Sequence, residues 1–212
     1  MTDLLTADQM RDIERTAIES GAVTGLELME RAGRGVVEAV FEQWPELERG
    51  PHRAVVFCGP GNNGGDGFVI ARLLREAEWD VAVYLYGDAV TLPPDAHTNY
   101  KRWVEAGTVR PMKDWQAGTW GCDLVVDALF GTGLKRGLRE LGELFWHMNE
   151  LVDCFSVDPG NEFGRPAIVA VDIPSGICAD SGRDFPHQDE HSRFAAAAHL
   201  TVTFHKLKLG HL

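Results

Sequence analysis

The sequence predicts an α/β protein, a Rossmann-like three-layer α/β/α sandwich around a mostly parallel sheet. Three observations predict it. Apolar runs of strand length alternate with amphipathic stretches of helix length along the chain. A glycine-rich segment, residues 58–67, directly follows the first apolar run, and two later runs each end in an aspartate. The 212 residues are enough for one such domain with a full core, so we expect a single domain over residues 1–212.

The first two predicted elements are helices, and each begins at a capping box. Thr6 is followed by Gln9, and Thr24 by Glu27, at the spacing that lets two side chains satisfy free backbone amides. Apolar residues then recur at helical spacing in both segments: Met10, Ile13 and Ala17 in the first, and Met29, Val36, Val37 and Val40 in the second.

The remaining elements alternate between strands and helices. We predict strands at 54–57, 81–86, 124–127, 168–171 and 200–204, and helices at 68–74, 95–106 and 138–151. Polar connections are expected at 111–121 and 153–166, and a charged surface loop at 184–191. Such alternation is typical of a parallel sheet with helices on both faces.

Composition excludes several classes of function. The net charge of -12 disfavours binding to nucleic acid or to an anionic membrane, because a long polyanion meets repulsion over its whole length. The chain shows no signal peptide and no apolar run long enough to span a membrane. Four widely spaced cysteines without C-x-x-C predict reduced thiols in a cytoplasm, and the absence of H-E-x-x-H argues against a zinc site.

The glycine-rich segment predicts a ligand-binding turn between the first strand of the sheet and a helix. Gly59, Gly61 and Gly64 match G-x-G-x-x-G, a weak signal by itself. We expect its glycines to permit positive φ and close approach of a ligand, and its amides to suit a phosphate. Asn62, Asn63 and Asp66 add polar groups that a simple phosphate cradle does not need. The alternative is an ordinary turn with Asn and Asp in left-handed geometry.

Two later strands end in an acid and a turn. Asp127 is followed by a second glycine-rich loop with Lys135 and Arg136, which can meet phosphate. Asp172 is followed by a rigid turn that carries Ser175. Each aspartate alone could be only a helix cap. Ligands of such sheets bind beyond the carboxyl ends of the strands, so the three motifs together predict one site.

The three motifs, in order and at separate strand ends, resemble the NAD(P)H-hydrate epimerase family, also called the YjeF N-terminal domain. The matching segments are 61–67, 127–134 and 171–176, with further similarity at 5–10, 28–33, 201–204 and 208–210. The chain departs from the family in three ways. His199 stands where an aspartate is common, the connection at 153–166 is longer, and the chain stops at Leu212. This leaves open whether the domain is excised from a longer bifunctional chain.

The resemblance implies an isomerase that epimerises the C6 hydroxyl of hydrated NADH and NADPH in nicotinamide nucleotide repair. One carboxylate can serve as both acid and base in such a reaction, and we expect it to be Asp172, because it lies at a strand end next to a rigid turn. The resemblance also implies a potassium ion held by Asn63, Asp127 and Ser175. The implied substrate contacts are Asn62, Asn63, Gly64, Gly65, Asp66, Gly131, Thr132, Gly133, Leu134, Lys135, Arg136, Gly137 and Asp172. The implied partners are an ADP- or ATP-dependent hydrate dehydratase, fused or separate, and a second copy of the chain in a homodimer.

Two other functions remain open at this point. The same fold serves as a non-catalytic scaffold for RNA or partner binding in eukaryotic mRNA decapping, but the acidic charge disfavours RNA, and the presence of Asp127, Asp172 and Ser175 favours the enzyme. A nicotinamide-dependent dehydrogenase would need a ribose-binding acid about twenty residues past the glycines, and Asp88 is only a loose candidate.

Overall fold

A six-stranded parallel sheet forms the centre of the molecule. The structure is a computed structural model that describes residues 4–116, 121–152, 165–185 and 195–212. The strand order is β3-β2-β1-β4-β5-β6, and every neighbouring pair is parallel. The strands are β1 Arg53–Cys58, β2 Asp80–Leu85, β3 Val109–Pro111, β4 Leu124–Ala128, β5 Ala167–Val171 and β6 Leu200–Val202. The predicted fold class is confirmed.

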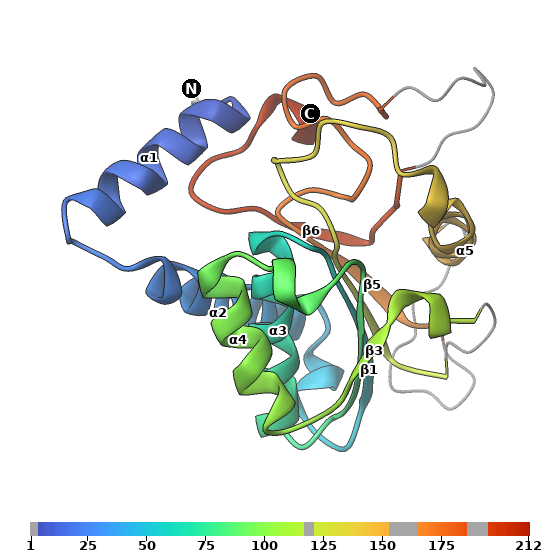
Figure 1. Ribbon diagram of the computed structural model, residues 1–212. Helices are drawn as coiled ribbons and strands as arrows, with labels where there is room; N and C mark the ends of the chain where they lie inside the picture. Colours follow the sequence, from blue (N-terminus) through green and yellow to red (C-terminus); the bar gives the residue numbers. More distant parts are fainter. Residues whose placement is uncertain (1–3, 117–120, 153–164, 186–194) are drawn as a thin grey trace.

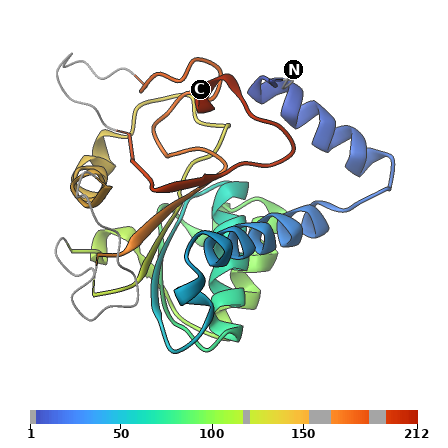
Figure 2. The same cartoon turned by 180° about the vertical axis from the view of Figure 1, so that it is seen from behind.

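Helices cover both faces of this sheet (Figures 1 and 2). Helices α2 (Gly25–Gln43), α3 (Asn62–Glu76) and α4 (Pro94–Val104) pack on one face, and α5 (Gly142–Val152) lies on the other. Helix α1 (Ala7–Glu19) stands apart from these layers. Short 3-10 turns occupy Pro45–Glu48, Ala89–Thr91, Met112–Asp114, Arg139–Leu141 and Leu209–His211. No helix in the described part of the chain is long and apolar enough to cross a membrane.

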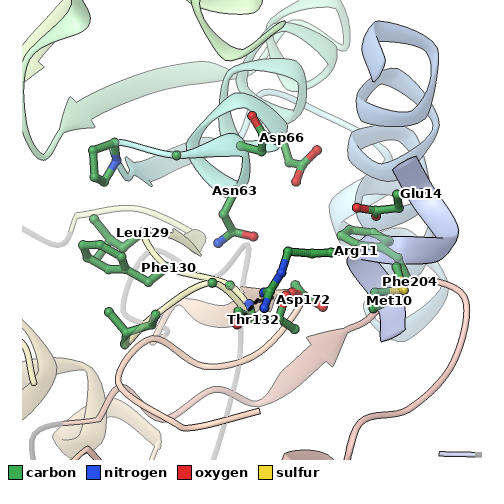
Figure 3. A pocket seen from close by; sticks show the side chains of 16 residues that line it. Met10, Arg11, Glu14, Asn63, Asp66, Leu129, Phe130, Thr132, Asp172 and Phe204 are labelled. Carbon is green, nitrogen blue, oxygen red and sulfur yellow. Dashed lines mark hydrogen bonds between the residues drawn. The ribbon is translucent and has the colours of Figure 1, made fainter. Parts of the chain in front are cut away.

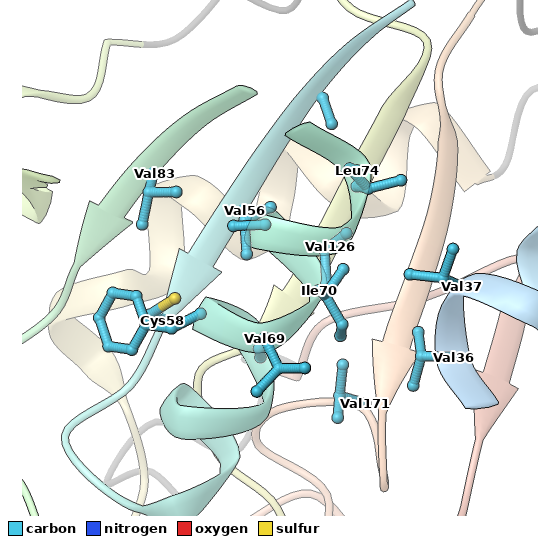
Figure 4. Packing of buried hydrophobic residues seen from close by; sticks show 14 of the residues in the cluster. Val36, Val37, Val56, Cys58, Val69, Ile70, Leu74, Val83, Val126 and Val171 are labelled. Carbon is cyan, nitrogen blue, oxygen red and sulfur yellow. The ribbon is translucent and has the colours of Figure 1, made fainter. Parts of the chain in front are cut away.

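The main core lies between the sheet and helices α2 and α3 (Figure 4). Val56, Val126 and Val171 of the central strands face Ile70 and Leu74 of α3, and all five side chains are buried. The central strands are almost wholly buried because helices lie over both faces, so their sequences are continuous apolar runs. This packing fixes the carboxyl ends of β1, β4 and β5 side by side.

Both predicted capping boxes are present. The Thr6 hydroxyl accepts from the Gln9 amide at 3.2 Å, and the Gln9 side chain accepts from the Thr6 amide at 2.9 Å. Thr24 and Glu27 form the same pair of bonds at the start of α2. The apolar stripe predicted for α1 is only partly buried: Met10 is in the interior, whereas Ile13 is 44% exposed. Helix α1 therefore contacts the rest of the molecule mainly through its first turns.

The glycine-rich segment differs from the prediction in two respects. Helix α3 begins at Asn62, six residues before the predicted start, so the Asn and Asp side chains belong to its first two turns. The expected positive φ values are wrong for this segment, since the positive-φ glycines are Gly21, Gly50, Gly87, Gly121, Gly176 and Gly182. Close packing explains its glycines instead. A Cβ on Gly59 would overlap the Leu129 carbonyl, and one on Gly64 would overlap the Gly59 carbonyl.

Smaller differences occur at the edges of elements. Strand β3 lies partly inside the connection expected at 111–121, α5 begins at Gly142 rather than at residue 138, and β6 ends at Val202. The connection at 153–166 and the loop at 184–191 fall mostly outside the described residues. The described cysteines, Cys58, Cys122 and Cys178, are free thiols.

Candidate active site

A cavity of about 340 Å³ opens at the carboxyl ends of β1, β4 and β5 (Figure 3). Five segments far apart in the sequence line it: one face of α1, the start of α3, the loop after β4, the residue after β5, and the chain just beyond β6. The lining residues are Met10, Arg11, Glu14, Pro60, Gly61, Asn62, Asn63, Asp66, Leu129, Phe130, Gly131, Thr132, Gly133, Leu134, Asp172 and Phe204. The three motifs of the sequence therefore meet in one place.

Asp172 occupies a strained position at the end of β5. Its φ is +68°, a left-handed conformation that few residues other than glycine adopt and that concentrates at functional sites. Its carboxylate is held from two sides. Oδ2 accepts from the Thr132 amide at 3.0 Å, and Oδ1 accepts from the Thr203 hydroxyl at 3.2 Å and from the Lys208 ammonium at 3.0 Å. The side chain is thus fixed in place at the pocket wall.

Two residues near position 210 support Asp172. Lys208 is completely buried, and its ammonium donates to Asp172 Oδ1, to Thr203 Oγ1 at 2.7 Å and to the Phe204 carbonyl at 3.1 Å. All three of its hydrogens are therefore used. His211 Nε2 lies 2.7 Å from the Asp172 carbonyl oxygen and supports the backbone. Sequence reasoning assigned neither side chain a role, although the match at 208–210 pointed to the segment.

Asp127 and Ser175 join the loops beneath the pocket. Both are fully buried. Asp127 accepts from the Ser175 hydroxyl at 2.6 Å, from the Ser175 amide at 2.8 Å and from the Leu129 amide at 3.2 Å. The Ser175 oxygen also accepts from the Phe130 amide at 2.9 Å. Burial raises the pKa of Asp127, although these hydrogen bonds oppose the shift. The pair ties the turn after β5 to the loop after β4.

Asn63 presents an unsatisfied buried group next to Asp172. Its Nδ2 atom is buried and has no hydrogen-bond partner in the described part of the chain. A Cβ on Gly131 would lie 3.0 Å from Asn63 Oδ1 and 2.8 Å from Asp172 Oδ2, so the glycine leaves the space between these two side chains open. Buried amide groups normally have partners, and an orphan at this place indicates a ligand that completes its bonding.

Two further carboxyl groups face the cavity. Burial raises the pKa of Asp66 well above its ordinary value, and the nearby charges of Asp172 and Glu14 raise it further. Burial also raises the pKa of Glu14, a shift that His205 opposes and Asp172 supports. Figure 3 shows Asp66 on the wall formed by α3 and Asp172 on the opposite wall. The site therefore holds two carboxyl groups with a raised pKa, Asp66 and Glu14, which suits acid–base chemistry.

The predicted site residues fall into three groups. Eight of them line the cavity: Asn62, Asn63, Asp66, Gly131, Thr132, Gly133, Leu134 and Asp172. Asp127 and Ser175 lie buried beneath it, and Gly64 and Gly65 are buried within α3. Lys135, Arg136 and Gly137 do not line the cavity, and Arg136 pairs with Glu140 at 3.1 Å. Their contacts with substrate stay predictions. Arg11, Glu14 and Phe204 were missed, since nothing local in the sequence places them beside the glycine loops.

Comparison with known proteins identifies relatives over the whole chain. Residues 25–210 match the family described as YjeF-related protein N-terminus. Proteins named NAD(P)H-hydrate epimerase from Rhodobacter capsulatus and Roseobacter litoralis are 47% and 46% identical, and each match covers 100% of this chain and 92% of the relative. The Vibrio cholerae protein named bifunctional NAD(P)H-hydrate repair enzyme Nnr is 39% identical over 86% of this chain and 33% of its own length.

A solved structure shares the fold. The crystal structure of the yeast protein ynu0 superposes with a TM-score of 0.70 at 24% identity, and the match covers 99% of this chain and 83% of the yeast chain. The sequence match over residues 25–210 and the full-length relatives agree with this likeness. The chain belongs to the YjeF-related protein N-terminus family.

Proposed function

We propose that this protein is an NAD(P)H-hydrate epimerase, which interconverts the R and S forms of hydrated NADH and NADPH. The observation that carries the proposal is the Asp172 carboxylate, held by three donors at the wall of a cavity between two glycine-rich loops. Relatives that are 46% and 47% identical over the whole chain bear this name, which supports the same function here.

The reaction needs proton transfer but no redox step. The lone pair of the ring nitrogen expels the hydroxyl from C6, and the departing oxygen takes a proton and leaves as water. Water then adds to the same carbon from the opposite face and gives up a proton. An acid is needed for the first step and a base for the second, and each such group typically contributes about 10²- to 10⁴-fold to the rate.

Asp66 and Asp172 can share these two tasks. The raised pKa of Asp66 keeps its proton over a wider pH range, so it is suited to protonate the departing hydroxyl. Asp172, paired with the Lys208 ammonium, is suited to accept the proton of the incoming water. The reverse reaction uses the same groups in exchanged roles, because every step is reversible.

A potassium ion fits residues that line the cavity and lie directly beneath it. Asn63, Asp127 and Ser175 offer amide, carboxylate and hydroxyl oxygens, the hard ligands that such a cation prefers. The Asn63 Oδ1 atom, which would be the ligand atom of this side chain, borders the space that Gly131 leaves open. A bound potassium ion would supply positive charge next to the substrate.

A dehydratase partner follows from the same proposal. An epimerase of this kind works with a dehydratase that consumes one of the two forms, and the match to bifunctional repair enzymes supports a fused or separate partner. The homodimer and the cytoplasmic location stay predictions. The two alternative functions, a non-catalytic scaffold for RNA or partner binding and a nicotinamide-dependent dehydrogenase, gain no support from the contacts of the described residues.

The direct test follows the conversion of purified R-NADPH hydrate to the S form by chromatography, while absorbance reports any hydride transfer. The wild-type protein should equilibrate the two forms without oxidising NADPH. The Asp172→Asn variant should lose about a hundredfold or more in rate while its circular dichroism is unchanged, because it lacks the acid/base group. No conversion by the wild-type protein would refute the proposal, and conversion within a few-fold by the variant would remove Asp172 from this role.

A further inference from the structure

Helix α1 forms one wall of the cavity although it lies before residues 25–210, the part of the chain that the family model matches. Met10, Arg11 and Glu14 face the cavity, whereas the family match begins at residue 25. The helix is held by a few contacts near its start. The Leu5 amide donates to the Leu207 carbonyl at 3.0 Å, and the Ala7 amide donates to the Asp180 carboxylate at 2.7 Å. Its position beside the cavity is thus fixed by bonds that do not involve a ligand.

The cavity lining has more acidic than basic side chains, which disfavours an anionic substrate. Glu14, Asp66 and Asp172 are acids, and Arg11 is the one basic side chain among the described residues of the lining. Lys208 is fully buried and its ammonium is saturated by Asp172, Thr203 and Phe204. A ligand that carries phosphate groups would need a cation at this cavity to offset the repulsion from the carboxylates.

Arg11 has a guanidinium that can meet such a group. Figure 3 shows its side chain extending from α1 across the cavity towards Thr132 and Asp172. Its Nη1 lies 3.4 Å from the Thr132 carbonyl oxygen, at the edge of the second glycine-rich loop. Its other partner is Asp8, whose side chain is 84% exposed, and an exposed ion pair of this kind contributes little. A planar guanidinium with several donors matches phosphate geometry well.

We propose that Arg11 binds the diphosphate of the dinucleotide substrate, so that α1 is part of the substrate-binding site. The inference rests on the proposed function for the identity of the substrate. It assigns to Arg11 the phosphate contact that Lys135 and Arg136 were expected to make. The nicotinamide end then lies deeper, between Asn63 and Asp172, and the diphosphate lies under the guanidinium.

The test separates phosphate recognition from a structural role of the helix. Calorimetry measures binding of ADP-ribose, which contains the diphosphate, and of reduced nicotinamide riboside, which contains no phosphate. The variants are Arg11→Met, Arg11→Lys and the matched control Arg15→Met, which lies one turn along α1 and pairs only with Asp12 and Glu19 among its described contacts. Thermal melting of each variant checks that it is folded.

We expect Arg11→Met to bind ADP-ribose about tenfold more weakly or worse, because a charge-assisted pair is lost. Arg15→Met should bind it within about twofold of wild type. Arg11→Lys should be intermediate, since it keeps the charge but loses the fork of donors. Binding of reduced nicotinamide riboside should be the same in all four proteins, and KM for R-NADPH hydrate should rise in Arg11→Met with kcat nearly unchanged.

Equal weakening of the binding of both ligands would show that Arg11 has a structural role, and would overturn the proposal. The proposal would also be overturned if Arg11→Met bound ADP-ribose as tightly as the wild-type protein, or if the wild-type protein did not bind ADP-ribose. If Arg11→Met does not fold, Arg11→Lys decides between the same outcomes. Failure of the epimerase function is distinguishable. A wild-type protein that binds ADP-ribose through Arg11 but does not convert the hydrate would refute the function and leave the phosphate site standing.

Discussion

At the scale of single residues, the ion pair of Asp172 and Lys208 is the contact with the largest energetic consequence. The Lys208 side chain is fully buried, so its charge has no water as a substitute partner, and that of Asp172 is only 12% exposed at the cavity wall. Loss of one member of a buried pair costs about 3–5 kcal/mol, because the other charge remains buried without compensation. Replacement of both residues costs less free energy, because no charge is then left buried without a partner.

We therefore predict that Lys208→Met lowers the free energy of unfolding by about 3–5 kcal/mol. The double variant Lys208→Met/Asp172→Asn should be more stable than Lys208→Met, because no buried charge is left alone. Urea unfolding of the wild type, both single variants and the double variant forms a double-mutant cycle, which measures the interaction energy between Lys208 and Asp172. A double variant that is no more stable than Lys208→Met would contradict a buried ion pair.

Asp66 gives a prediction about pH. A carboxyl group whose pKa is higher in the folded than in the unfolded protein binds more protons when folded, so stability falls as pH rises from about 4 through the folded pKa. Asp66→Asn removes this contribution. Its melting temperature should match that of wild type near pH 4 and exceed it at pH 8, when both are measured by thermal melting at constant ionic strength. The same difference at every pH would be evidence against the raised pKa.

The sequence predicted those site residues that follow strands and missed those that reach the site by long-range packing. Asp127, Asp172 and Ser175 were found because strand-end acids next to turns are local signals. Lys208 and Arg11 carry no such signal, since each lies in a segment that is brought to the cavity only when the ends of the chain fold against the sheet. An isolated lysine or arginine is otherwise expected at the surface.

At the scale of elements, the start of α3 shows how its glycines act. A Cβ on Gly64 would overlap the Gly59 carbonyl, whereas a Cβ on Gly61 would meet nothing within 4 Å. The two positions lie at the same end of α3, but Gly61 is its N-cap and Gly64 lies within its first turn, and they differ in the space beside them. Lack of space therefore requires glycine at position 64 but not at position 61.

We predict that Gly64→Ala lowers the free energy of unfolding by about 1–3 kcal/mol or more, because the backbone must move to admit the methyl group. Gly61→Ala should cost less than about 1 kcal/mol, mainly because alanine is a poorer N-cap than glycine. Chemical denaturation of both variants provides the comparison. Equal effects would mean that the close approach of Gly59 and Gly64 does not limit the packing.

The elements that sequence reasoning found and missed differ in length. The buried central strands and the capped helices were predicted because their apolar patterns are long and their starts are marked. Strand β3 has only three residues, which is too few to show a pattern. The start of α3 was placed too late because Asn and Gly are poor helix formers, and tertiary packing against Met29 and Ala96 overrides that preference.

At the scale of the whole molecule, an ion that binds only the folded protein raises its stability by mass action. We predict a higher melting temperature in potassium than in lithium at equal ionic strength, because Asn63, Asp127 and Ser175 would hold the larger ion. Asp127→Asn should abolish the difference by removing the anionic ligand of this set. Identical melting of the wild-type protein in both salts would contradict the potassium site.

The pairing of Leu5 with the segment at Leu207 and Lys208 has a consequence for the order of events in folding. It joins positions near the two ends of the chain, and contacts between such distant positions close the largest loops and tend to form late. The sheet and its helices can therefore assemble before Asp172 gains Lys208 and before Arg11 reaches Thr132. During refolding, we expect activity to appear in a separate, slower phase after the secondary structure is complete. In the folded protein, a brief local opening of the contact between Leu5 and Leu207 should abolish activity while the core stays folded.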